Sequence, residues 1–418
     1  MHGAPRLAVA ALLLASCAAQ APALPKSAES DTVVLRAGAS LQVWDAKGAL
    51  VETFDRAVSS PDGSVFYSLG GSTLRWNDAK TGRQITQLAL PADYVFSNER
   101  GPNPTGFSPN GRWLVLVGAA GGATSTFAIV DTGLLRVAAI AEVPGAFTYD
   151  AISDDGTSLY LIERMTAEKA KALLAVDPSY AYRVRVFDVP AQKLSETLVV
   201  DVKLASQTTD NNAQTRIDGI MTGIYQSSVP SRDGQWNFSF YYNPNRGPFI
   251  HVLHLNARTA FCILDLPILA GGSDKRLGWS LALTSSGQTL YAVNGPLGLV
   301  SAIDALTLKV GRTATVAGLP APAEKIDSSS SATISQDARK LYFTATRGVA
   351  FVDTRDYSLR GHFLPDHPIA SISLSQDGHR LWALARDGTL WMLDATTGRQ
   401  QAQIATGGAT ALVGVGSH

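Results

Sequence analysis

Few residues in this chain have the types and spacing that catalysis requires. His251 and His254 lie three positions apart in a strand-like run, so their side chains face opposite ways and cannot chelate one metal ion as a pair. Ser280 follows Gly278 and Trp279 as in a nucleophile elbow, but the closing glycine is missing and another strand follows, not a helix. We therefore expect structural roles for these residues and predict no catalytic residue.

Oxygen-bearing side chains occur together in two further segments. Asp210 and Asp218 belong to a polar stretch whose side chains offer oxygen atoms that calcium would accept as ligands. The spacing of these residues departs from that of a calcium-binding loop and favours a solvated insertion. Asp366 and His367 could form a polar pair, although a turn before Pro368 explains them equally well. The chain has no Cys-x-x-Cys-His, which excludes covalent haem attachment of the usual kind, and no His-Glu-x-x-His. We predict no metal site and no cofactor.

The clearest chemistry is at Cys17. The apolar run 7–14 is too short to cross a hydrocarbon layer as a helix, for which about 20 residues are needed, so residues 1–17 are an export signal. Leu14-Ala15-Ser16-Cys17 resembles the lipobox of bacterial lipoproteins, which implies cleavage before Cys17 and lipidation of its thiol. An ordinary cleaved signal is the alternative. Residues 18–31, rich in Ala, Pro and Ser, are predicted to be a flexible tether.

These features predict where the protein resides. Ala18 after the cysteine is similar to the pattern that sorts lipoproteins to the outer membrane of Gram-negative bacteria. We expect an exported protein that contacts the membrane through its lipid anchor only, facing the periplasm in such a bacterium and at the cell surface otherwise. Lys plus Arg and Asp plus Glu balance at 35 each, so nucleic acid is not an expected partner.

A repeated phrase predicts the elements that position these residues. It consists of an apolar run, a Ser-x-Asp-Gly turn, a second strand-like run and then a strand that ends in Asp. The fourth residues of the successive turns are Gly63, Gly111, Gly156, Gly234, Gly287, Ala338 and Gly378. Most of these intervals match the period at which a four-stranded propeller blade recurs. A composition of 45% hydrophobic and 17% charged residues, with 37 Gly, suits such an all-β body.

The phrase resembles the YVTN-type and WD40-like repeats of exported bacterial propellers, a group similar to the heavy chain of quinoprotein amine dehydrogenases. The resemblance covers about residues 32–418. It implies a single all-β propeller of four-stranded antiparallel blades. The repeat motif identifies the fold but says little about the function.

The number of blades follows from the repeats and the two ends of the chain. Seven first strands are expected near residues 56, 105, 148, 226, 279, 331 and 370. Residues 33–54 supply three more strands, and residues 409–415 can supply a fourth. Joining the N- and C-terminal strands makes an eighth blade and closes the ring without an exposed edge. We therefore favour eight blades over the alternative of seven.

The long connections between strands are the expected binding site. Strands alternate in direction, so the short turns share one rim and the long connections share the other, and function concentrates on loops held by a rigid scaffold. The two longest, 163–182 and 201–223, belong to the fourth blade, and 166–175 has a helical pattern. Aromatic and cationic side chains, the usual anchors of recognition surfaces, occur in this sector. The rim candidates are Tyr241, Tyr242, Arg246, Lys275, Arg276 and Trp279. Packing of the aromatic members between blades is the alternative.

Two functions remain open. One is a lipid-anchored propeller that binds an envelope protein or a small ligand through its long-loop rim. The other, which the resemblance suggests, is an enzyme or enzyme subunit: a dehydrogenase heavy chain that docks a cofactor-bearing subunit, or a sugar-lactone hydrolase. An enzyme should gather carboxylates and histidines over the central channel, and the sequence places no such cluster. The binding scaffold is therefore the favoured prediction.

Overall fold

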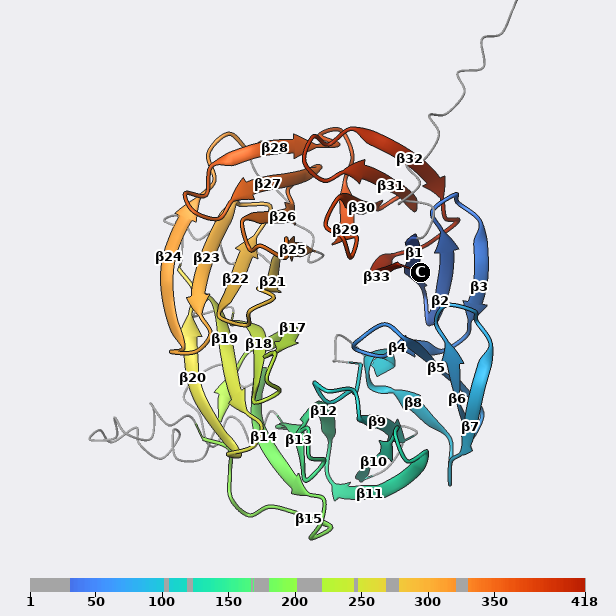
Figure 1. Ribbon diagram of the computed structural model, residues 1–418. Helices are drawn as coiled ribbons and strands as arrows, with labels where there is room; N and C mark the ends of the chain where they lie inside the picture. Colours follow the sequence, from blue (N-terminus) through green and yellow to red (C-terminus); the bar gives the residue numbers. More distant parts are fainter. Residues whose placement is uncertain are drawn as a thin grey trace, which may run out of the picture.

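The computed structural model describes residues 31–100, 105–118, 123–166, 168, 180–200, 220–243, 247–267, 278–320 and 330–417. Within these residues, eight antiparallel sheets stand in a ring around a central channel (Figure 1). The predicted all-β propeller with eight four-stranded blades is confirmed. In the part of the chain that the structure describes, no helix has the length and apolar character needed to cross a membrane.

The blades are numbered along the chain, and the strands of each follow one another from the channel outward. Blade 1 consists of β33 (Ala411–Ser417), β1 (Asp31–Ala37), β2 (Ser40–Asp45) and β3 (Leu50–Phe54). Blade 2 consists of β4 (Ala57–Ser59), β5 (Val65–Gly70), β6 (Thr73–Asp78) and β7 (Gln84–Ala89). Blade 3 consists of β8 (Tyr94–Phe96), β9 (Trp113–Gly118), β10 (Thr124–Asp131) and β11 (Arg136–Pro144). Blade 4 consists of β12 (Phe147–Ile152), β13 (Ser158–Arg164), β14 (Ala181–Asp188) and β15 (Lys193–Leu194), and β16 (Met221–Thr222) also pairs with β14.

The second half of the ring repeats this plan. Blade 5 consists of β17 (Ile224–Pro230), β18 (Trp236–Asn243), β19 (Gly247–His254) and β20 (Thr259–Asp265). Blade 6 consists of β21 (Trp279–Leu283), β22 (Thr289–Asn294), β23 (Leu299–Asp304) and β24 (Lys309–Thr315). Blade 7 consists of β25 (Ala332–Ile334), β26 (Lys340–Thr344), β27 (Val349–Asp353) and β28 (Leu359–Phe363). Blade 8 consists of β29 (Ile369–Leu374), β30 (Arg380–Ala385), β31 (Thr389–Asp394) and β32 (Gln400–Ala405).

The Ser-x-Asp-Gly turn is a closed hydrogen-bond network between the first and second strands of a blade. In blade 2, the Ser60 hydroxyl donates to Asp62 Oδ1 at 2.6 Å and accepts the Val65 N–H at 3.0 Å. Asp62 Oδ1 also accepts the Ser64 N–H, and Gly63 has a φ of 73°, which is cheap only for glycine. Four further turns repeat these side-chain bonds, at 153–158, 231–236, 335–340 and 375–380. The motif therefore sets the turn between the first and second strands in blades 2, 4, 5, 7 and 8.

The Asp that ends a third strand accepts hydrogen bonds from the turn that follows. Asp78 Oδ1 accepts the N–H groups of Lys80 and Thr81 at 3.1 and 2.7 Å. Blade 5 has His254 at this position, and its Nδ1 accepts the N–H groups of residues 256 and 257 instead. The Nδ1 atom of His254 thus replaces the usual carboxylate oxygen as acceptor, which explains how blade 5 can depart from the repeat.

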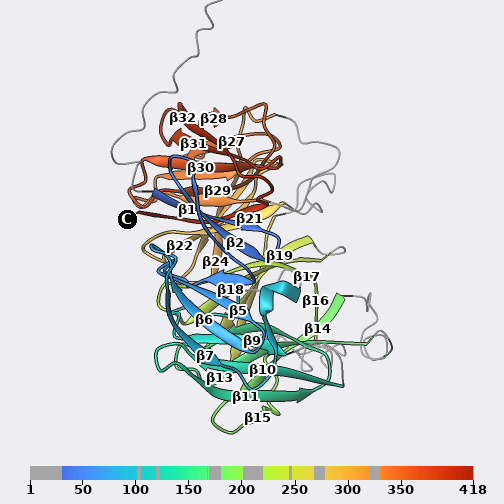
Figure 2. The ribbon, with the colours of Figure 1, turned by 90° about the vertical axis from the view of Figure 1, so that its right-hand side faces the viewer.

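The two ends of the chain close the ring, as predicted. Strand β1 pairs with β33 from Asp31 opposite Ser417 to Arg36 opposite Ala411, and blade 1 lies beside blade 8 in both views (Figures 1 and 2). The carboxylate of Asp31 is buried and accepts Arg380 Nε at 2.6 Å, Arg380 Nη2 at 2.8 Å and Trp382 Nε1 at 3.1 Å. The first described residue is therefore fixed to β33 through the ladder and to β30 of blade 8 through its side chain.

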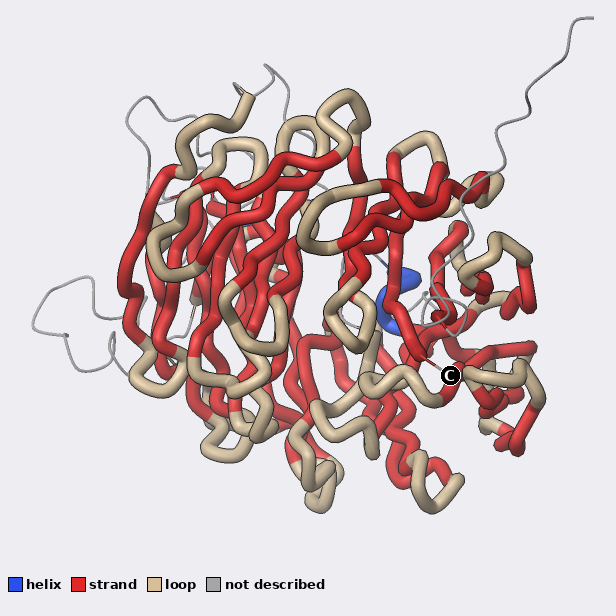
Figure 3. Tube along the Cα trace, turned by 45° about the horizontal axis from the view of Figure 1, so that its top comes forward, coloured by secondary structure: helices blue, strands red, loops and turns tan. Residues whose placement is uncertain are grey.

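The prediction that the first strand of blade 3 starts near residue 105 is wrong. The inner strand is β8, Tyr94–Phe96, followed by a single 3-10 turn, η2 (Ser97–Arg100), shown in blue in Figure 3. Phe107 contributes only an isolated bridge to Leu114. The stretch between β7 and Phe107 therefore contains the first strand of blade 3. Pro104 and Pro109 lack the N–H that a ladder needs, so the chain pairs earlier, where Tyr94 and Phe96 can be buried.

Candidate functional site

The aromatic rim candidates that the structure describes are buried. Tyr241 and Tyr242 lie near the end of β18 with 2% and 8% of their surface exposed, and Trp279 begins β21 with 4% exposed. Tyr241 stacks on Tyr182 between blades 4 and 5, with ring centroids 4.9 Å apart. Trp279 packs against Phe240 between blades 5 and 6. These three side chains therefore pack inside the body, and a role in binding stays a prediction.

The remaining candidates on the long-loop rim lie outside the described residues. They are Arg246, Lys275 and Arg276, together with the polar stretch around Asp210 and most of the helical pattern at 166–175. Ser280 lies in β21, buried, with its hydroxyl accepting a hydrogen bond from Ser330 at 3.4 Å. Asp366 and His367 lie in a turn in which the His367 N–H donates to the Leu364 carbonyl, which agrees with the turn explanation.

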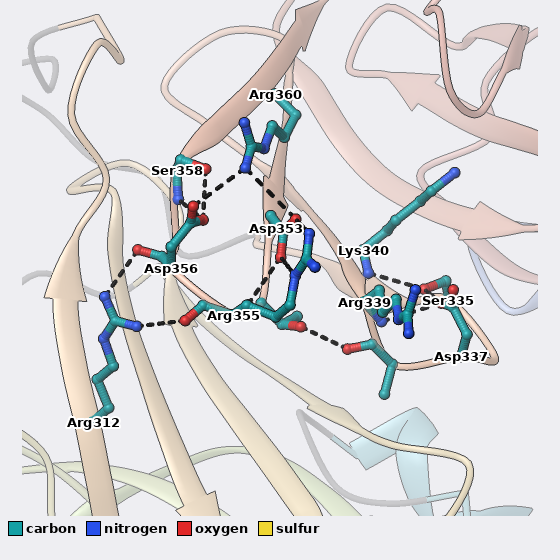
Figure 4. A network of polar contacts seen from close by, with 12 residues as sticks. Arg312, Ser335, Asp337, Arg339, Lys340, Asp353, Arg355, Asp356, Ser358 and Arg360 are labelled. Atoms are coloured by element: carbon teal, nitrogen blue, oxygen red, sulfur yellow. Dashed lines mark hydrogen bonds and ion pairs between the residues drawn. The ribbon is translucent and has the colours of Figure 1, made fainter.

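Polar contacts on the turns of blade 7 form a second cluster, shown in Figure 4. Arg355 donates to Asp353 at 2.7 Å, and Arg360 pairs with Asp356 at 3.2 Å. Arg312 reaches across from blade 6 and donates to the backbone carbonyls of residues 355 and 356. Hydrogen bonds from Arg355 hold the pKa of the Asp353 carboxyl well below its usual range. Both carboxylates are paired within the protein, so this exposed cluster fixes the turns and does not resemble a ligand site.

The central channel is lined by the inner strands and by the Ser-x-Asp-Gly turns. A cavity of about 680 Å³ occupies it and touches blades 2, 3, 5, 6 and 7. Its lining includes Asp62, Tyr67, Asn110, Arg232, Ala282 and Thr333. These side chains come from rigid inner strands and tight turns, so the cavity has a defined shape.

A second cavity, of about 360 Å³, is lined by residues of blades 2, 3, 4 and 5 and contains a buried carboxylate. Asp150 lines it and is 4% exposed. Among the described residues, no donor lies within hydrogen-bond distance of this carboxylate, and burial alone raises its pKa to about 7. Burying a carboxylate without a protein partner lowers the stability of the fold. Asp150 is therefore our candidate functional residue among the residues that the structure describes.

A β-bulge places Asp150 in this position. In the pairing of β12 with β13, the register shifts between Tyr149 and Ala151, so that Asp150 has no partner on β13. Tyr149 then packs between blades 3 and 4, whereas Ala151 packs between blades 4 and 5. Bulges redirect side chains and are frequent next to active sites. The first strand of blade 5 has a similar shift between Tyr225 and Ser227, directly across this blade interface.

Tyrosines surround the carboxylate. Tyr149 donates to the Phe107 carbonyl at 3.1 Å, and Tyr225 donates to the Ser228 hydroxyl at 2.9 Å. Burial first, and then the negative charge of Asp150, raise the pKa of the Tyr149 hydroxyl. The same two causes act on the pKa of Tyr182. These hydroxyls therefore stay neutral in the physiological range, and Asp150 is the group that titrates there.

His251 lies in the same blade interface but offers no charge at neutral pH. It is fully buried on β19, beside the Tyr241 ring, and burial lowers its pKa to about 4. Its Nε2 has no hydrogen-bond partner in the described part of the chain. Where the structure describes the chain, no group of three His, Cys, Asp or Glu side chains could hold a metal ion. The site can therefore bind, hold or exchange a proton at Asp150, but it does not offer a metal-ligand set.

Sequence reasoning missed Asp150. No motif surrounds it, and it follows the repeat only as part of an apolar first strand, 147–152. One signal could have found it: it is the charged residue in an otherwise apolar and aromatic strand that must face the channel. The rim prediction concerned the loops of blades 4 and 5 and not their inner strands, and it stays a prediction.

Comparison with known proteins supports the fold. No protein-family model matches the chain, and no curated protein sequence matches it. AztD from Citrobacter koseri is similar in structure, with a TM-score of 0.52 and 13% identity over 93% of this chain and 97% of that chain. The dihydro-heme d1 dehydrogenase NirN in complex with DHE matches with a TM-score of 0.51 and 12% identity over 96% of this chain and 78% of that chain. At such identities the similarity shows the propeller fold and nothing finer.

Proposed function

We propose that this chain is an exported, lipid-anchored β-propeller that acts as a binding scaffold and holds a small ligand in the cavity beside Asp150. One observation carries the proposal: a buried carboxylate with no donor among the described residues lines a cavity between rigid inner strands. Small-molecule sites are concave, largely apolar and equipped with a few precisely placed polar groups. The Asp150 cavity has these properties.

The lipid anchor rests on Cys17 and its resemblance to a lipobox. The ring begins at Asp31, so residues 18–30 would connect it to the lipid and could reach at most about 45 Å when fully extended. The proposal places the protein at the periplasmic face of an outer membrane, or at the cell surface in a bacterium without one. Arg246, Lys275 and Arg276 are the residues that we propose for contact with an envelope protein.

A cavity-blocking variant tests the proposed ligand site. Ser228 lies on β17 and lines the cavity, so Ser228→Phe fills part of its volume, whereas Ser72→Phe adds the same ring to an exposed turn of blade 2. The detergent-extracted full chain is measured against a panel of small metabolites by ligand-observed NMR. We expect compounds that bind the unmodified chain and Ser72→Phe but not Ser228→Phe. The proposal fails if no compound binds, or if every compound binds Ser228→Phe equally well.

A propeller enzyme is the second candidate, and one observation favours it. A general base works best with a pKa near the operating pH, and burial raises the pKa of Asp150 to about 7. An enzyme would convert the compounds that bind, and Asp150→Asn would abolish turnover while leaving the compound bound. Unchanged recovery of the bound compound after prolonged incubation supports the scaffold.

A further inference from the structure

We infer that the cavity beside Asp150 takes a small organic cation, of the class of protonated primary amines with an aromatic or apolar body. This inference rests on the proposed ligand site and names the chemistry of its occupant. It follows from three features of the cavity: its charge, its unpaired acceptors and its walls.

Among the side chains that the structure describes, the cavity has one negative charge and no compensating positive charge. Asp150 is the only Asp, Glu, Lys, Arg or His among the described residues that line it. No positive charge of the described residues lowers the pKa of the Asp150 carboxyl, which burial raises. A charge removed from water without a partner is strongly unfavourable. A ligand that brings the missing positive charge gains the interaction that the protein leaves open.

The unpaired polar atoms of the cavity are acceptors. Asn98, on η2, also lines the cavity, and its side-chain oxygen is buried without a hydrogen-bond partner among the described residues. Together with the two oxygens of Asp150, this atom needs N–H or O–H donors. A primary ammonium group supplies three donors and accepts none, which matches such a set.

The walls of the cavity suit the body of an organic cation. The rings of Phe107, Tyr149 and Tyr225 line it, together with Ile152 and Leu255. Aromatic faces attract cations through their quadrupole, and apolar walls bind an apolar body. The volume of about 360 Å³ is at the small end of the range for small-molecule sites. A divalent metal ion would find one carboxylate in this cavity and no second ionic ligand among the described residues.

Three probes of one shape and different charge test the inference. They are 2-phenylethylammonium, 2-phenylethanol and phenylacetate, titrated into the detergent-extracted full chain at pH 8 by calorimetry. We expect the ammonium to bind at least tenfold more tightly than the alcohol, and phenylacetate to bind most weakly. Equal affinities for the ammonium and the alcohol, tighter binding of phenylacetate, or no binding of any probe overturns the inference.

Variants show whether Asp150 is responsible. Asp150→Asn keeps the shape and removes the charge, so it should weaken 2-phenylethylammonium at least tenfold and leave 2-phenylethanol within about twofold. Asp93→Asn makes the same charge change at an exposed position and should change neither. Unchanged affinity of the ammonium in Asp150→Asn overturns the inference.

These outcomes distinguish the cation inference from the proposed ligand site. If 2-phenylethanol binds as well as the ammonium and is lost in Ser228→Phe, the cavity is the ligand site and only the cation preference is refuted. If no probe binds, the cation inference is refuted, and the metabolite panel decides the proposed site independently.

Discussion

Replacing Asp150 by Asn should stabilise the protein, and the gain should grow with pH. Burial raises the pKa of this carboxyl from its ordinary value of 3.8 to about 7 in the folded protein. At pH values between these two pKa values, the Asp150 carboxyl is ionised in the unfolded chain and protonated in the folded protein. Its contribution to the stability of the folded protein therefore falls as the pH rises. Above pH 7 the folded protein must carry the buried charge in full, at a cost of about 4 kcal/mol. At pH 5 the corresponding cost is less than half of this value.

The pH dependence isolates the charge from every other effect of the substitution. The Asn amide brings its own packing and hydrogen-bond cost, but that cost is the same at every pH. We therefore expect the stability of Asp150→Asn, relative to the unmodified chain, to rise by roughly 2 to 3 kcal/mol between pH 5 and pH 8. Urea denaturation without ligand at the two pH values measures it, with Asp93→Asn as the control that should show no such rise. An equal difference in stability at both pH values would refute the conclusion that Asp150 is buried and unpaired.

Three further predictions concern the closure of the ring, the ligand and the anchor. Asp31→Asn should lower the free energy of unfolding by about 3 kcal/mol, since it removes the buried carboxylate charge that pairs with the buried Arg380. Arg355→Gln removes the exposed ion pair with Asp353 (Figure 4) and should leave the thermal midpoint unchanged. Equal losses of stability in Asp31→Asn and Arg355→Gln would contradict the expectation that the buried ion pair contributes more than the exposed one. The affinity for 2-phenylethylammonium should increase with pH by up to tenfold per pH unit below pH 7 and should level off above pH 7. Calorimetry at several pH values measures this dependence, which Asp150→Asn should remove. Cys17→Ala should release the protein from the membrane fraction, and retention there would count against lipid anchoring.

The fold was predictable because the features that determine it are local. The Ser-x-Asp-Gly turn needs only residues within six positions of one another, so Ser60, Asp62 and Gly63 specify it wherever the phrase occurs. The closure of the ring followed from counting strands at the two ends. Blade 3 was misassigned because β8 is only three residues long and carries no turn motif of its own.

The candidate site was not predictable because it depends on contacts between blades. Whether Asp150 faces water or a neighbouring blade is decided by a one-residue shift in register, and nothing in the neighbouring sequence marks that shift. The same holds for Tyr241, whose type suggests a recognition surface. It is buried because Tyr182 and Phe249, from other strands, stack against its ring.

The pairing of β1 with β33 constrains the order in which the protein can be made. Among the strands that the structure describes, β1 is synthesised first and β33 last, so blade 1 cannot be completed until β33 is available. Until then, β1 has an unsatisfied edge that could pair with another nascent chain. We expect slow acquisition of the native state and a need for holding chaperones during biogenesis, because contacts between residues so distant along the chain form late.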